Sequence, residues 1–70
     1  MIRKGTRVSW KWGNGEAEGK VIDTYTRKVT KKIKGNEITR IGEEGNKVLL
    51  IQQEDGTQVI KKENEVSRKG

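Results

Sequence analysis

Polar and apolar residues alternate over much of the chain, and this alternation predicts β-strands. From Arg7 to Trp12 the sequence RVSWKW has an apolar side chain at every second position. That period matches a strand with one face in the core. We therefore expect a strand here, with a buried face carrying Val8, Trp10 and Trp12.

A second strand is expected directly after this one. The turn-forming residues Gly13-Asn14-Gly15 end the first strand, and Ala17–Tyr25 is rich in β-branched residues. Gly19 interrupts this second stretch, and a glycine inside a strand often marks a bulge or a sharp bend. Such a bend would let a short sheet curl onto itself.

The middle of the chain predicts a hairpin. Two β-branched stretches, Val29–Lys34 and Glu37–Ile41, flank Gly35-Asn36, a dipeptide typical of two-residue hairpin turns. A short helical turn is the alternative, because Lys and Glu tolerate helix well. The hairpin register would form two favourable cross-strand pairs, Ile33 opposite Ile38 and Lys34 opposite Glu37.

The last third of the chain predicts another hairpin and a loose tail. Lys47–Gln53 contains the unbroken apolar run VLLI, which indicates a strand buried on both faces. Glu54-Asp55-Gly56 forms the next turn, and Thr57–Lys62 returns as the partner strand. Glu63–Val66 resembles a single short turn, and Ser67–Gly70 is expected to fray.

Composition supports an all-β fold with five to six short antiparallel strands. Of the 20 apolar residues 13 are Val or Ile, and six Thr add further β-branched side chains. The 70 residues are expected to form a single domain. A sandwich usually needs about 100 residues, so a small, strongly bent barrel fits this length better.

The residue types present exclude most enzyme chemistry. The chain has no Cys and no His, which removes disulfides, thiolate and imidazole metal ligands, and the usual nucleophile and base. We therefore expect no catalysis, no cofactor and no metal site. No apolar stretch approaches the roughly 20 residues that span a bilayer, and we expect a soluble, cytoplasmic protein.

The net charge of +6 and the pI near 9.8 direct attention to the hairpin segment. Alternation would line up Lys28, Lys32 and Lys34 on one side, where they could contact nucleic-acid phosphates. The alternative is a solvated hairpin in which lysines prevent edge-to-edge sheet pairing. Five cations lie within eight residues: Arg27, Lys28, Lys31, Lys32 and Lys34.

The chain has three aromatic residues, Trp10, Trp12 and Tyr25. An aromatic cage for a methylated cation needs two to four rings around one pocket, usually with an acidic neighbour. Strand alternation assigns Trp10 to the core, which leaves Trp12 and Tyr25 for a pocket, with Asp23 or Glu16 as acidic companions. The same two rings could instead stack on unpaired bases.

Several stretches resemble the hypervirulence-associated Tudor-domain family of small bacterial and fungal proteins. The resemblance extends from about Lys4 to Val66 and implies an SH3-like barrel of the Tudor type. The family name records similarity to domains that often read methylated Lys or Arg or bind nucleic acid. It is carried by KGTRVSWKWG (4–13), AEGKV (17–21), VTKKIKGNEITR (29–40) and QEDG (53–56).

These observations predict a noncatalytic binding module. Charge favours nucleic acid as the partner, bound through the basic hairpin. The alternative is a protein-interaction domain that takes a peptide or a methylated residue along an open barrel edge or at Trp12 and Tyr25. No membrane and no small-molecule substrate is expected.

Overall fold

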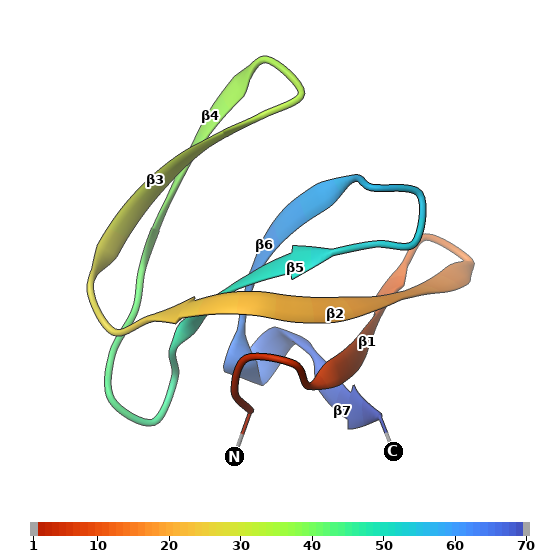
Figure 1. Cartoon of the computed structure of the whole chain (residues 1–70), viewed down its shortest axis with the longest axis horizontal. Helices are drawn as coiled ribbons and strands as arrows, with labels where there is room; N and C mark the ends of the chain where they lie inside the picture. Colours follow the sequence, from red (N-terminus) through yellow and green to blue (C-terminus); the bar gives the residue numbers. More distant parts are fainter. Residues whose placement is uncertain (1, 70) are drawn as a thin grey trace.

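The computed structural model describes residues 2–69 and consists almost entirely of antiparallel strands (Figure 1). A five-stranded sheet has the order β6-β5-β2-β1-β7, and β3 and β4 form a separate two-stranded sheet. The expected all-β, antiparallel class is confirmed. The elements are β1 (Arg7–Trp12), β2 (Gly15–Tyr25), β3 (Lys28–Ile33), β4 (Asn36–Ile41), β5 (Val48–Gln52), β6 (Gln58–Lys62), the 3-10 turn η1 (Glu63–Glu65) and β7 (Ser67–Lys69).

The long strand β2 organises the fold. Its first part pairs with β1 and its second part pairs with β5. Figure 1 shows β2 crossing the whole width of the molecule, with β1 at one end and the β3–β4 hairpin leaving from the other. The register shifts between Val21 and Asp23, so the expected irregularity falls just after Gly19 rather than at it.

Gly19 lies where β2 comes unusually close to β5. A Cβ there would stand 2.6 Å from Cγ2 of Ile51 and 2.8 Å from the carbonyl oxygen of Gln52. Real side chains do not tolerate such distances, so β2 can lie this close to β5 only where the side chain is absent.

The apolar run of β5 joins two core clusters. Leu49 and Ile51 belong to the cluster around Val8, Trp10 and Val21. Val48 and Leu50 point to the other face and pack with Ile60, where the hairpin residues Ile33 and Ile38 cover them. The expectation of a strand buried on both faces is confirmed, since all four side chains are at most 8% exposed.

For Trp12 the buried position given by alternation was wrong and the exposed alternative holds, and the expectation of a frayed tail was wrong for Ser67–Lys69. Trp12 is 64% exposed, because it is the last residue of β1 and lies beyond the region that the other strands cover. The tail does not fray over Ser67–Lys69, because these residues form β7 and pair with Arg7–Ser9 of β1. Gly70 lies outside the described residues.

The short 3-10 turn η1 carries the chain from one edge of the five-stranded sheet to the other. It follows β6 directly and leads into β7. Within residues 2–69 no helix is long and apolar enough to cross a membrane.

Candidate functional site

The β3–β4 hairpin carries most of the net charge of the chain. Residues 27–41 contain six Lys and Arg and a single acid, Glu37, so they hold five of the six net positive charges. Figure 1 shows this hairpin as an arm that extends away from the five-stranded sheet. The charge is therefore presented on a projecting element.

The hairpin forms as predicted, but its turn begins one residue earlier, so each cross-strand partner shifts by two residues. Lys34 and Gly35 occupy the turn with φ of 51° and 81°. Two positive φ values define a type I′ turn, which takes glycine readily at its second central position. The expected turn at Gly35-Asn36 was therefore wrong. The observed cross-strand partners are Ile33 with Asn36, Lys32 with Glu37 and Lys31 with Ile38.

The outer face of the hairpin is mostly polar, with the exposed Ile41 opposite Lys28 and the acid Glu37 opposite Lys32. Lys28, Thr30 and Lys32 alternate along β3 and are exposed. The Oγ1 atoms of Thr30 and Thr39 share a hydrogen bond of 2.9 Å across the two strands. Lys28 and Lys32 thus flank a fixed pair of threonines, while Lys34 lies in the turn rather than in this row.

The inner face of the hairpin holds it against the body of the protein. Val29 is 7% exposed, and Ile33 and Ile38 pack on the cluster of Val48 and Leu50. The segment is therefore a packed hairpin, and its inner face is not available to a partner.

Arg27 and Lys31 belong to a small polar cluster around Tyr25. The Arg27 guanidinium carbon lies 5.2 Å, and the Lys31 Nζ 5.4 Å, from the centroid of the Tyr25 ring. The Tyr25 hydroxyl donates to Oδ2 of Asp23 at 3.0 Å. The ring is thus occupied by cations of the chain itself.

Asp23 completes this cluster as a charged acceptor. Its Oδ1 accepts a hydrogen bond of 2.9 Å from the backbone N–H of Thr24. This bond, then the bond from Tyr25, and then the nearby charges of Lys4 and Lys31, hold the pKa of Asp23 below its ordinary value of 3.8. The carboxylate stays ionised at neutral pH and offsets part of the positive charge on this side of the hairpin.

Trp12 and Tyr25 lie at opposite ends of β2 and do not form one pocket. Trp12 pairs with Gly15, the first residue of β2, and its indole lies 3.8 Å from where a Cβ of Gly15 would stand. Tyr25 is the last residue of the same strand. Ten residues of extended chain span up to roughly 33 Å. Trp10, in contrast, is 8% exposed and lies in the core as expected.

The family model for the TUDOR domain of hypervirulence associated proteins matches residues 5–66. The chain belongs to this family. The resemblance expected from the sequence is thereby confirmed, and membership supports a small binding module in general. No curated protein and no solved structure matches the chain.

This Tudor domain has a second basic region that the sequence analysis did not identify. Cations from the two ends of the chain line one hollow, because β7 pairs with β1. The three-residue strand β7 has no alternating apolar pattern, so nothing in the local sequence indicates this pairing. The five cations are Arg3, Lys4, Arg7, Arg68 and Lys69.

Proposed function

We propose that this Tudor domain is a noncatalytic module that binds nucleic acid through the outer face and turn of the β3–β4 hairpin. Lys28, Lys32 and Lys34 would contact phosphates, and Arg27 and Lys31 would add charge beside Tyr25. The observation that carries the proposal is the concentration of five of the six net charges in residues 27–41. Lysine side chains neutralise phosphates without reading sequence, so we expect little base specificity.

The local geometry supports this use of the hairpin. Within residues 2–69, no carboxylate forms an ion pair with Lys28, Lys32 or Lys34 within 4.0 Å. The packed inner face fixes the strand that carries Lys28 and Lys32. An anion would therefore meet exposed lysines on a packed hairpin, with Glu37, the one acid of residues 27–41, opposite Lys32.

The direct test is a titration with labelled single-stranded and duplex oligonucleotides, followed by fluorescence anisotropy at several salt concentrations. On duplex DNA the logarithm of the affinity should fall with the logarithm of salt by about 0.9 per phosphate contact. The double variant Lys28→Gln/Lys32→Gln should bind more weakly and reduce this slope by about 1.8. No binding at micromolar protein, or an affinity that salt does not change, would reject the proposal.

A matched control separates a hairpin site from a general effect of net charge. Lys11 and Lys20 are exposed lysines on β1 and β2, outside the hairpin. The variant Lys11→Gln/Lys20→Gln removes the same charge as the hairpin variant and should keep most of the affinity. An equal loss in both variants would contradict binding at the hairpin.

A second candidate function rests on the exposure of Trp12. This indole is 64% exposed, which is unusual for so large an apolar ring and typical of an interaction surface. The alternative partner is a protein segment, including a peptide with a methylated lysine or arginine. Intrinsic tryptophan fluorescence should then change on adding such a peptide and stay constant with oligonucleotide. The reverse result favours nucleic acid. We also propose a cytoplasmic location, which cell fractionation would check.

A further inference from the structure

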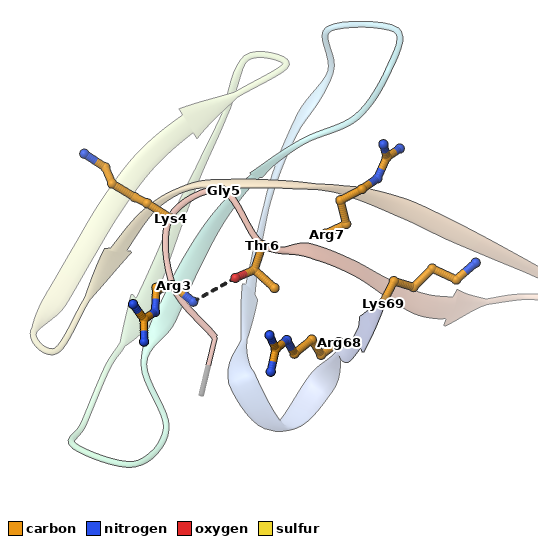
Figure 2. A pocket seen from close by; sticks show the side chains of 7 residues that line it. All are labelled: Arg3, Lys4, Gly5, Thr6, Arg7, Arg68 and Lys69. Atoms are coloured by element: carbon orange, nitrogen blue, oxygen red, sulfur yellow. Dashed lines mark hydrogen bonds between the residues drawn. The ribbon is translucent and has the colours of Figure 1, made fainter.

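A basic hollow lies between the N-terminal turn and β7, apart from the hairpin (Figure 2). Its volume is about 650 Å³, and five of its seven lining residues are cationic. Pockets for small ligands usually measure about 300–1,000 Å³ and are mostly apolar. This hollow has the usual size but a cationic lining, which favours an anionic ligand. The lining residues are Arg3, Lys4, Gly5, Thr6, Arg7, Arg68 and Lys69.

Backbone hydrogen bonds fix the turn that forms one wall. The N–H of Thr6 donates to the carbonyl of Arg3 at 3.0 Å, and the Arg3 N–H donates to Oγ1 of Thr6 at 3.2 Å. Gly5 has a φ of 89°, which a tight turn of this kind requires at its third residue. Its N–H donates to Val21 of β2 at 2.7 Å. The turn is therefore attached to the sheet and does not have to form when a ligand binds.

The opposite wall is set by the pairing of β7 with β1. In this register Lys69 lies opposite Arg7, and Arg68 lies opposite Val8. Figure 2 shows the Arg68 side chain extending from β7 toward the turn, between the side chains of Arg3 and Lys69. The same figure shows the Arg3 and Lys4 side chains on the outer side of the turn.

The charge in this hollow is only partly compensated. Arg7 pairs with Glu54 at 3.4 Å and Lys69 with Glu18 at 2.9 Å, both in exposed positions where ion pairs are weak. Arg3, Lys4 and Arg68 have no carboxylate within 4.0 Å in the described part of the chain. Like charges gathered in this way repel one another, and a bound anion would relieve that repulsion.

We propose that this hollow binds a phosphate group of a phosphorylated ligand. Arginine forms paired hydrogen bonds with phosphate oxygens, and Arg68 extends from β7 toward the turn that carries Arg3. Thr6 and the turn backbone line the same hollow. The inference does not depend on nucleic-acid binding at the hairpin, because the two regions share no residue.

The test is an NMR titration of the full chain with inorganic phosphate and then pyrophosphate, at ionic strength held constant with sodium chloride. Amide signals of residues 3–7 and 67–69 should shift in a saturable way, while those of the hairpin stay unchanged. Shifts confined to the hairpin, shifts spread over all exposed lysines, or no saturable shift would overturn the proposal.

Variants assign the binding to the two arginines. Arg3→Gln and Arg68→Gln should each weaken binding about tenfold, the usual effect of losing a charge-assisted hydrogen bond. Lys11→Gln, an exposed charge elsewhere on β1, should leave the affinity unchanged. Since Trp10 is buried, its fluorescence reports whether each variant is folded. Equal affinity of folded Arg68→Gln and the unchanged protein would contradict the assignment.

A further experiment identifies which kind of molecule carries the phosphate. Oligonucleotides with a 5′-phosphate and with a 5′-hydroxyl are compared in the Lys28→Gln/Lys32→Gln background, where hairpin binding is weakened. A preference for the 5′-phosphate that Arg68→Gln abolishes would identify a strand end as the ligand. Binding of free phosphate and pyrophosphate without such a preference would identify a small phosphorylated compound. Either result supports the phosphate site, and each is distinguishable from a failure of the hairpin proposal.

Discussion

Arg40 on β4 forms an ion pair with Glu65 in η1, which joins the basic hairpin to the turn before β7. The same Glu65 oxygen accepts a hydrogen bond from the backbone N–H of Lys62 at 2.7 Å. One carboxylate therefore holds the hairpin and caps η1.

The stability of the fold should depend on the ionisation of Glu65. Partial burial raises its pKa, but the Lys62 N–H and the Arg40 guanidinium together lower it by more, so that the pKa lies below its ordinary value of 4.5. A carboxyl group whose pKa is lower in the folded state stabilises that state at pH values above its pKa in the unfolded chain. This stabilisation is lost as the pH falls through the pKa of the folded state. Glu65→Gln keeps an acceptor for Lys62 and loses the charge.

We expect Glu65→Gln to lower the free energy of unfolding at pH 7 by about 0.2–1 kcal/mol, because the pair is partly exposed. Below pH 4.5 the difference from the unchanged protein should shrink. Urea denaturation at pH 7 and at several lower pH values measures this, with Glu44→Gln as the control. A difference that stays constant down to pH 2 would show that ionisation of Glu65 contributes nothing.

The turn residue Lys34 should be a site of stored strain. It is the one non-glycine with positive φ in residues 2–69, and this conformation costs an L-residue with a long side chain roughly 1–2 kcal/mol. Asn tolerates it, and Asn-Gly is a favoured type I′ sequence. Lys34→Asn should raise the free energy of unfolding by about 0.5–1 kcal/mol. Lys32→Asn, in the strand itself, should not stabilise. If both variants are destabilised equally, the strain is absent.

The alternation of polar and apolar residues predicted nearly every strand, because it reflects which side chains of a strand are buried. The run at 48–51 shows this most clearly, since a strand buried on both faces needs apolar side chains at every position. The position of the turn in the β3–β4 hairpin was missed because Gly35 suits either of two neighbouring registers. Both registers place Ile33 and Ile38 on the same face, and the observed one differs by having the two positive-φ residues, Lys34 and Gly35, in the turn.

The functional surfaces were predicted less completely, for a different reason. The hairpin cations are neighbours in sequence, so their clustering is visible in the chain. Alternation also placed Lys28 and Lys32 on one face, as observed, but it did not indicate that Lys34 lies in the turn or that Lys31 lies beside Tyr25. The hollow depends on the pairing of Arg7–Ser9 with Ser67–Lys69, and the backbone hydrogen bonds of that pairing leave no pattern in the side chains.

Two glycines of β2 should respond differently to the same substitution. At Gly19 an added Cβ would meet Cγ2 of Ile51 and the Gln52 carbonyl at distances below 3.0 Å, and the backbone oxygen cannot move aside. We expect Gly19→Ala to lower the free energy of unfolding by about 1–3 kcal/mol. At Gly15 the nearest atom is Trp12 at 3.8 Å, an ordinary contact, so Gly15→Ala should change little. Thermal denaturation of both variants measures the two losses of stability. Similar losses would contradict a close approach at Gly19.

Replacing Trp10 should lower stability strongly, and replacing Trp12 should change it little. Trp10 is 8% exposed and packs in the main core cluster, whereas Trp12 is 64% exposed at the end of β1. Trp10→Ala should cost about 3–5 kcal/mol, comparable with the whole stability of a domain this small, so the variant should be largely unfolded. Trp12→Ala should change stability by about 0.5 kcal/mol or less.

Acrylamide quenching tests the burial of each indole in the folded state. Trp12→Phe leaves a shielded indole, and Trp10→Phe leaves an accessible one. Strong quenching of the indole that remains in Trp12→Phe would show that Trp10 is not buried.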